Sequence, residues 1–85
     1  MTRIVKIGAA QLGPIQRADS RASVVKRLLE LMREAHAMAC DVVVFPELAL
    51  TTFFPRWYMA DQAEVDSFFE SQMPGPETRV LFDEA

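Results

Sequence analysis

The stretch Asp41–Trp57, DVVVFPELALTTFFPRW, contains the signal that decides the fold of this chain. It opens with an uninterrupted apolar run over residues 42–45 and passes directly into Pro46 and Glu47. A strand without a polar face is typical of a parallel sheet that is covered on both sides. Pro46 cannot donate to a sheet ladder, so it predicts the end of the strand and fixes the direction of Glu47.

Two elements upstream of this strand complete a βαβ unit. Ile4–Gln11, IVKIGAAQ, is β-branched at its start and small at its end, which is typical of a buried strand. Asp19 or Ser20 then supplies a helix N-cap, and residues 24–39 follow a helical period. The predicted apolar face of that helix consists of Val24, Val25, Leu28, Leu31, Met32, Ala35 and Ala39. A strand, a helix and a strand at this spacing predict two parallel strands, and the expected fold class is α/β.

Downstream of the second strand, the sequence predicts a loop over residues 48–60 and two further helical segments. Asp61 predicts an N-cap, and Glu64 stands three residues later in capping-box position. The sequence MPGP around Pro74 ends that helix, and a helical period resumes over residues 77–85. The predicted buried face of the second helix consists of Val65, Phe68 and Phe69.

Composition and charge exclude several classes of function. The chain is 51% hydrophobic and 25% charged with a net charge of -3, which is typical of a globular protein. Its basic residues are scattered, unlike the basic stripe of a nucleic-acid-binding protein, and no apolar run suits a membrane span or a signal peptide. The single cysteine, Cys40, cannot form an internal disulfide. We therefore expect a cytoplasmic protein that binds neither nucleic acid nor membranes.

The number of strands bears on domain organisation. Only two strands are predicted in 85 residues, which leaves unpaired edges and uncovered apolar faces. We expect residues 1–85 to be the amino-terminal part of one larger domain, either as a fragment or as a truncated gene product. Alone, such a chain is expected to be poorly soluble or molten. The alternative is a genuine short protein that serves as a non-catalytic interaction module.

Glu47 is the candidate catalytic residue. Functional residues of open α/β sheets gather just beyond the carboxyl ends of the strands, and Glu47 stands there. At the end of so apolar a strand, its carboxylate is expected to be partly desolvated, which suits a general base. The alternative roles are the cap of a following turn and a surface ion pair.

The sequence around Glu47 also resembles a known family. The motif D-V-V-V-F-P-E, preceded by an amphipathic helix and by a strand ending in A-A-Q, resembles the start of the nitrilase superfamily of carbon–nitrogen hydrolases. The continuation ELALTTFFPRW, residues 47–57, together with DSFFE and MPGP, is similar to the N-carbamoyl-D-amino acid amidohydrolase branch of that superfamily. The resemblance covers Arg3–Ala85.

This resemblance implies a four-layer αββα sandwich, to which the chain contributes the first strands and helices. It implies hydrolysis of N-carbamoyl-D-amino acids to D-amino acid, carbon dioxide and ammonia by a homo-oligomer, with no metal or organic cofactor. A Glu-Lys-Cys triad would perform the reaction, and the match gives the glutamate role to Glu47. The lysine and cysteine would lie beyond Ala85, so residues 1–85 alone are expected to be inactive. Other amidases of the superfamily, acting on N-carbamoylputrescine or on aliphatic amides, are the alternatives.

Several other side chains could carry chemistry, and most have a structural interpretation. Cys40 precedes the second strand, at the opposite end from Glu47, and is interpreted as a structural thiol. Lys26 falls on the solvated face of the first helix, so it is not the triad's lysine. His36 is the only histidine, which excludes a histidine metal cluster.

The aromatic and basic residues after Glu47 have two interpretations each. Phe53, Phe54 and Trp57 either form a wall of the substrate pocket or pack against the next helix or a partner subunit. Packing is favoured for at least two of the three. Arg56 either contacts a substrate carboxylate or is an ordinary ion pair or snorkelling surface residue, and the second interpretation is favoured.

Overall fold

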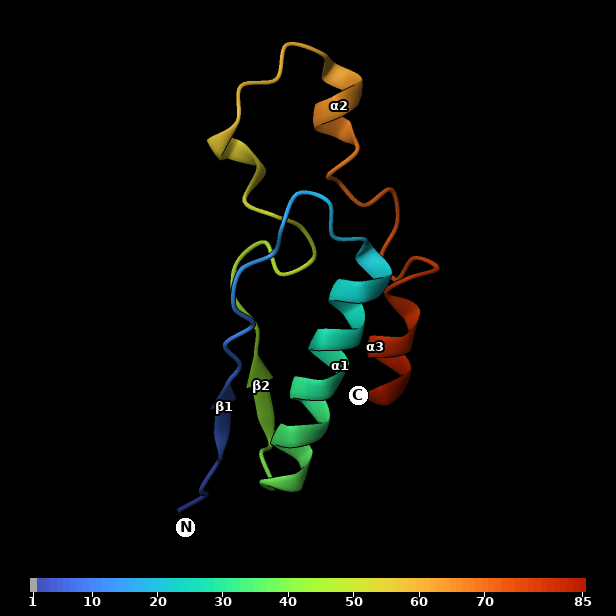
Figure 1. Ribbon diagram of the computed structural model, residues 1–85. Helices are drawn as coiled ribbons and strands as arrows, with labels where there is room; N and C mark the ends of the chain where they lie inside the picture. The colour runs from blue at the N-terminus through green and yellow to red at the C-terminus, as the bar shows by residue number, and fades with distance from the viewer. Residues whose placement is uncertain (1) are drawn as a thin grey trace.

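The computed structural model describes residues 2–85, which form a parallel βαβ unit with a helical extension (Figure 1). The elements are β1 (Ile7–Ala9), α1 (Arg21–Ala37), β2 (Val42–Val44), the 3-10 turn η1 (Phe54–Arg56), α2 (Gln62–Asp66) and α3 (Arg79–Glu84). The predicted α/β class and the predicted order of strands and helices are confirmed. Both strands are shorter than the sequence predicts.

The two strands pair in parallel, as the βαβ pattern predicts, and Gly8 lies opposite Val43 in the register. Two hydrogen bonds fasten the start of the sheet. The Lys6 backbone N–H donates to Asp41 Oδ2 at 2.9 Å, and the Asp41 N–H donates to the Lys6 carbonyl at 2.7 Å. The register of the pair is thus set before the apolar residues of β2 begin.

Only one face of this sheet is covered. Gly8 faces α1, because a Cβ atom on Gly8 would lie 3.8 Å from the Cβ atom of Ala35. On the opposite face, Ile7, Val42 and Val44 are 63%, 45% and 55% exposed. The open face agrees with the uncovered apolar faces expected for residues 1–85, and coverage of the strands on both sides stays a prediction for the larger domain.

Helix α1 begins where local hydrogen bonding favours it. Ser20, rather than Asp19, is the N-cap, and its Oγ accepts a hydrogen bond from the Ser23 N–H at 3.1 Å. The buried residues of α1 are Val24, Val25, Leu28, Leu29 and Ala35. Leu29 is buried although the predicted face does not include it. The buried face of α1 is wider than predicted because α1 contacts α3 as well as the sheet. Ala39, which was on the predicted face, is exposed beyond the helix with φ of 60°.

The core lies between α1 and the segments that leave the strands. Leu12, Val24 and Leu28 form its buried centre. The half-buried residues packed against this centre are Ile15, Leu31, Phe45, Ala49, Leu50 and Leu81. Leu12 follows β1, so the core continues directly beneath the loops at the carboxyl ends of the strands.

Helix α3 lies against α1 (Figure 1) and confirms the helical period predicted near the end of the chain. Arg33 Nε donates to Glu84 Oε1 at 2.9 Å. This hydrogen bond, together with the charge of Glu84, raises the pKa of Arg33 above its ordinary value. Before the helix, Thr78 is buried, and its Oγ1 accepts a hydrogen bond from the Gly75 N–H at 2.7 Å.

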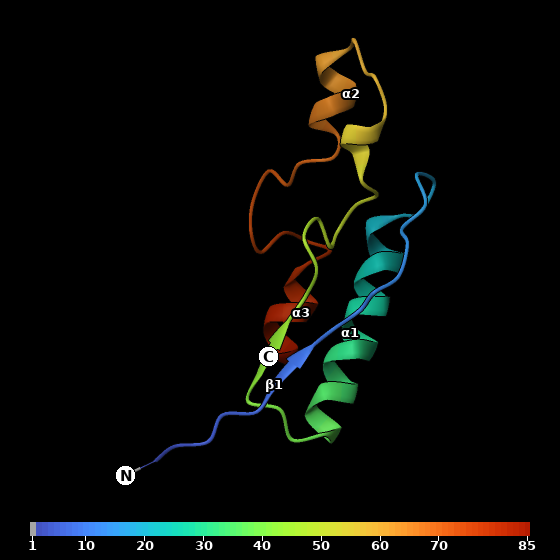
Figure 2. The same cartoon turned by 90° about the vertical axis from the view of Figure 1, so that its left-hand side faces the viewer.

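Residues 53–70, which include η1 and α2, project from one end of the molecule in both views (Figures 1 and 2). The molecule measures 55 × 25 × 23 Å and its radius of gyration is 15.1 Å. A compact chain of this length would have a radius of gyration of about 12 Å. The projecting segment therefore has less contact with the rest of the chain than a packed layer would have.

The second helix begins as predicted but is built differently. The Asp61 side chain caps it by accepting from the Ala63 N–H at 3.0 Å. Glu64 does not complete a capping box, because its carboxylate pairs with Arg17 instead. Of the predicted buried face, Val65 and Phe68 are half-buried, whereas Phe69 is 60% exposed because no further layer covers it.

No helix within residues 2–85 is long and apolar enough to cross a membrane.

Candidate functional site

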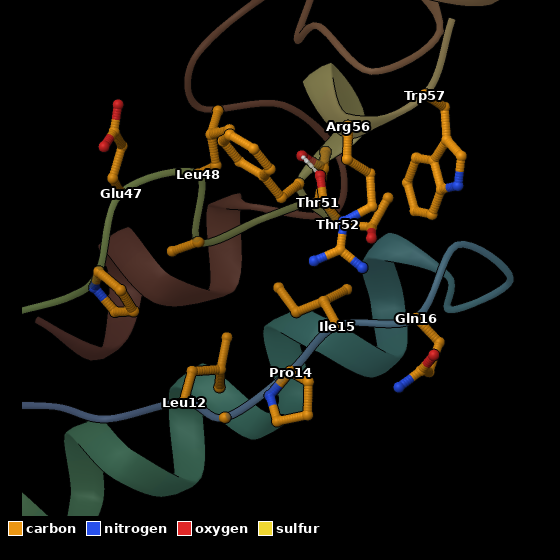
Figure 3. Close-up of a pocket in the computed structure, with 14 residues that line it drawn as sticks. Leu12, Pro14, Ile15, Gln16, Glu47, Leu48, Thr51, Thr52, Arg56 and Trp57 are labelled. Carbon is orange, nitrogen blue, oxygen red and sulfur yellow. Dashed lines mark hydrogen bonds between the residues drawn. The ribbon is translucent and has the colours of Figure 1, made fainter.

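A pocket with a volume of about 260 Å³ lies at the carboxyl ends of β1 and β2 (Figure 3). It is lined by residues 12–16, 46–49, 51–53, 56 and 57. The Ala10 N–H donates to the Val44 carbonyl at 2.9 Å, which keeps the two chain segments together as they leave the sheet. This end of a parallel sheet is where functional residues are generally placed.

Arg27 of α1 holds residues 12–16, the first wall of the pocket, in place. Its guanidinium donates to the Pro14 carbonyl at 3.1 Å and also to the Leu12 carbonyl. Gly13, between these two residues, has φ of 78°, a conformation that glycine adopts without strain. The sequence interpretation did not single out Arg27, because a guanidinium that binds loop carbonyls leaves no local sequence signal.

Glu47 lies on the rim of this pocket, two residues after half-buried Phe45 and directly after Pro46. The chain turns sharply behind it, since Leu48 has φ of 52° and the Thr51 N–H donates to the Leu48 carbonyl at 3.3 Å. In Figure 3 the Glu47 side chain extends away from the other labelled side chains. The turn therefore places Glu47 on the rim, with its carboxylate directed outward from the other residues of the lining.

The surroundings of Glu47 differ from what the sequence predicts. The residue is exposed, so the expected partial desolvation is wrong for the described residues, because no apolar layer covers the strand end. Among residues 2–85, the Glu47 carboxylate makes no hydrogen bond and no ion pair. The alternative roles of turn cap and surface ion pair are thus not formed within this part of the chain.

Two threonines that the sequence interpretation did not single out also line the pocket. Thr52 is only 5% exposed, and its carbonyl accepts hydrogen bonds from Thr51 Oγ1 at 3.0 Å and from the Phe54 N–H at 2.7 Å. The dashed line in Figure 3 marks the bond between the two threonines. They stiffen the loop that leads from Glu47 to η1.

Arg56 and Trp57 form the far side of the pocket, and Arg17 contacts the Trp57 ring from outside the lining. The Arg17 Cζ atom lies 5.2 Å, and the Arg56 Cζ atom 5.5 Å, from the centroid of the Trp57 ring, which is cation–π range. Arg17 also pairs with Glu64. Arg56 makes no ion pair within residues 2–85 and is exposed, which agrees with the favoured surface role but not with an ion pair. Its contact with a substrate carboxylate stays a prediction.

The three aromatic residues have different surroundings. Phe54 packs on Phe68, with ring centroids 5.0 Å apart and nearly parallel planes, and meets the edge of Phe69 at 5.6 Å. Phe53 and Trp57 both line the pocket instead. Phe54 therefore packs against residues of the following helical segment as predicted, and the packing of Phe53 or Trp57 against a partner subunit stays a prediction.

The remaining candidates lie away from this pocket. Cys40 is half-buried at the start of β2, the opposite end of the sheet from Glu47. Lys26 is exposed on α1, as its place on the solvated face predicts, and His36 is exposed on the same helix. Within residues 2–85, no group of three or more histidine, cysteine, aspartate or glutamate side chains is placed to hold a metal ion.

The polar side-chain groups that line this pocket are the Glu47 carboxylate, the Arg56 guanidinium, the Gln16 carboxamide, the Trp57 indole N–H and two threonine hydroxyls. A carboxylate can accept and return protons. The described residues bring no cysteine or lysine side chain to the pocket lining. A nucleophile and a group that stabilises negative charge on oxygen would have to join Glu47 from elsewhere.

Comparison with known families gives one result. The sequence model of the family described as carbon-nitrogen hydrolase matches residues 6–85. The match includes both strands, α1, α2 and α3, and the pocket with Glu47 on its rim.

Proposed function

The chain belongs to the carbon–nitrogen hydrolase family, whose members hydrolyse carbon–nitrogen bonds, and from that premise we propose a substrate and a role for Glu47. The substrate is an N-carbamoyl-D-amino acid, and the products are the D-amino acid, carbon dioxide and ammonia. The similarity of ELALTTFFPRW, residues 47–57, to the carbamoylase branch supports this choice. Residues 1–85 form the amino-terminal part of the hydrolase domain.

The observation that carries the proposal is the free carboxylate of Glu47 on the rim of the pocket. A general base must be able to reach the proton that it accepts, and a carboxylate already engaged in an ion pair or a cap is a weaker acceptor. Glu47 is exposed and has no partner among the described residues. It is therefore available to a thiol that approaches from another part of the domain.

The proposed reaction proceeds in two steps through a covalent intermediate. Glu47 accepts the proton of a cysteine thiol, and the thiolate attacks the carbamoyl carbon while a lysine stabilises the negative charge on oxygen. Glu47 returns that proton to the terminal nitrogen, which leaves as ammonia; this breaks one carbon–nitrogen bond and leaves a thiocarbamate adduct on the cysteine. Water, deprotonated by Glu47, then hydrolyses that adduct to the free thiol and an N-carboxy-D-amino acid, which loses carbon dioxide to give the D-amino acid. The cysteine and lysine of this triad are supplied by parts of the domain beyond Ala85.

The architecture proposed for the whole domain is the four-layer αββα sandwich. The open face of the sheet supports it, because Ile7, Val42 and Val44 form an apolar surface that a further layer would bury. Full coverage of that face would also bring an apolar environment closer to the strand end that carries Glu47. The homo-oligomeric state and the cytoplasmic location stay predictions.

The test uses the full-length enzyme that includes residues 1–85, with ammonia release as the readout. We expect turnover of N-carbamoyl-D-amino acids by the wild type and a collapse of turnover in Glu47→Gln, which keeps the shape and removes the base. Glu30→Gln is the matched control, since Glu30 is exposed on the solvated face of α1. Near-normal turnover by Glu47→Gln would refute the assigned role.

A substrate panel separates the branches of the family. Activity on N-carbamoylputrescine or on aliphatic amides, with none on N-carbamoyl-D-amino acids, would replace the proposed substrate while leaving the role of Glu47 in place. If no lysine and cysteine follow in the reading frame, the non-catalytic alternative takes the place of the enzyme.

A further inference from the structure

We propose that Arg17 and Arg21 are positioning residues that hold the outer wall of the pocket, residues 53–57, in place. The inference rests on the proposed function, because this wall bounds the pocket in which Glu47 would act. The outer wall belongs to the projecting segment 53–70, and both arginines lie near the start of α1 on the body of the molecule. They are separated from their partners by more than 40 residues of sequence.

Arg21 binds the carboxyl-terminal end of the projecting segment, residues 67–70. Its Nε pairs with Glu70, and its second nitrogen donates to the Ser67 carbonyl at 2.8 Å and to the Phe69 carbonyl at 3.5 Å. The side chains of Arg21 and Glu70 are only 26% and 20% exposed. A guanidinium with several donors in a fixed plane can hold a carboxylate and two carbonyls at once, which a lysine cannot reproduce.

Arg17 fastens the middle of the segment and touches the wall itself. It pairs with Glu64 of α2, and its Cζ atom lies 5.2 Å from the centroid of the Trp57 ring. One side chain therefore links α2, the outer wall and the body. The two charged groups are 46% and 42% exposed, so salt should weaken this link more than the link through Arg21.

The packing of the segment explains why such links are needed. The stacked rings of Phe54 and Phe68 both belong to the segment, so this apolar contact holds its two halves to each other rather than to the body. A cavity of about 400 Å³ lies between the segment and the body. Its body side is lined by Arg17, residues 19–21 and residues 50–52, and its segment side by Glu64, Ser67 and Phe68. Without close apolar packing across that cavity, the position of the wall depends on the arginines.

Trp57 gives a direct readout in the full-length enzyme when tryptophans outside residues 1–85 are replaced by phenylalanine, because residues 1–85 contain no other tryptophan. We expect Arg17→Gln and Arg21→Gln to raise the quenching of Trp57 fluorescence by acrylamide about twofold, the change that a lost ion pair implies. High salt should raise the quenching of Trp57 in the wild type toward the value measured for Arg17→Gln. Arg33→Gln, which breaks the pair with Glu84 on α3, is the matched control and should leave the quenching unchanged.

Unchanged quenching in both arginine variants would overturn the proposal. So would a wild-type chain in which Trp57 is as accessible to acrylamide as it is in denaturant. If a variant loses the circular dichroism of its helices, Arg17→Lys decides, because lysine keeps the positive charge that pairs with Glu64 and faces the Trp57 ring. Recovery of the wild-type quenching supports the proposal, and no recovery overturns it.

The consequence for catalysis is tested in the full-length enzyme. We expect KM to rise about threefold to tenfold in Arg21→Gln with kcat nearly unchanged, because the wall shapes the pocket but does not touch the reacting atoms. Arg21→Lys should not restore KM. A wild-type KM in Arg21→Gln would overturn the proposal. Inactivity of the wild-type enzyme on carbamoyl substrates would instead remove the proposed function and leave the fluorescence result to decide the positioning role.

Discussion

The Sγ atom of Cys40 lies 3.1 Å from the position that a Cβ atom on Gly8 would occupy. This is closer than ordinary van der Waals contact, so the strand and the thiol approach each other only because Gly8 has no side chain. The next nearest atoms, the Cβ atoms of Ala35 and of Cys40 itself, would both lie at 3.8 Å, which is an ordinary contact. The thiol sets the spacing between β1 and the end of α1, which is a packing role.

This relationship predicts that the effect of Gly8→Ala on the free energy of unfolding depends on the residue at position 40. In the wild type we expect a loss of about 1 kcal/mol in the free energy of unfolding, because the new methyl group displaces the Cys40 thiol. In the Cys40→Ala background the same change should be neutral or stabilise by about 0.5 kcal/mol, since alanine restricts the unfolded chain. Urea unfolding of the four proteins measures the coupling. An equal cost in both backgrounds would contradict the packing role of Cys40.

The end of α1 predicts a stabilising substitution. The Cys40 N–H donates to the Ala35 carbonyl at 3.0 Å, and the Ala39 N–H donates to the His36 carbonyl at 2.9 Å, which is the Schellman arrangement. Ala39 stands where glycine is usual, with φ of 60°. We expect Ala39→Gly to stabilise the protein by about 0.5–1 kcal/mol, because glycine adopts this conformation without strain. Ala37→Gly, inside the last turn, should destabilise by about the same amount. Thermal unfolding followed by circular dichroism distinguishes the two.

A buried hydroxyl before α3 gives a third prediction. Thr78 is 1% exposed, and its Oγ1 accepts a hydrogen bond from the Gly75 N–H. Thr78→Val keeps the shape of the side chain and leaves that N–H without a partner, so we expect a loss of about 1–3 kcal/mol. Thr78→Ser keeps the hydroxyl and should lose less. Equal losses in a urea titration would mean that the methyl group, rather than the hydrogen bond, stabilises the turn.

The exposure of Glu47 predicts that its removal does not affect stability. Because its carboxylate has no partner among the described residues, Glu47→Gln should change the free energy of unfolding by less than about 0.5 kcal/mol. The measurement is a urea titration of the purified protein beside Glu30→Gln. A loss well above that limit, unmatched in the control, would support the turn-cap or ion-pair role and weaken the catalytic one.

Local sequence chemistry predicted the elements of this fold well. The helical period located α1, the apolar run located β2, and Asp61 was identified as an N-cap, because each signal depends on neighbours a few residues away. Coverage of the sheet could not be predicted in this way. Whether Val42 and Val44 are buried depends on which layers pack on them, and the continuous apolar run implies coverage that the described residues do not supply.

The candidate site shows the same division. The position of Glu47 beyond the strand followed from Pro46 and from the geometry of parallel sheets. Its exposure did not, because exposure depends on distant parts of the structure. Glu64 fitted a capping box by spacing alone, yet Arg17, 47 residues away in sequence, takes its carboxylate. Long-range partners of charged side chains leave no periodic signal, which is also why Arg27 was missed.

Arg27 supplies the last prediction, because its side chain joins α1 to the pocket. Its guanidinium donates to the carbonyls of Pro14 and Leu12, so Arg27→Gln should leave at least one of these groups without a partner. We expect a loss of about 1–3 kcal/mol and faster amide exchange over residues 12–16, the first wall of the pocket. Lys26→Gln is the matched control, since Lys26 is the exposed neighbour on the same helix. If both variants lose equal stability, the positive charge on α1, rather than the hydrogen bonds of Arg27 to residues 12–16, accounts for the loss. If only Arg27→Gln speeds amide exchange over residues 12–16, Arg27 couples α1 to this wall, and substitutions on α1 will affect the pocket opposite Glu47.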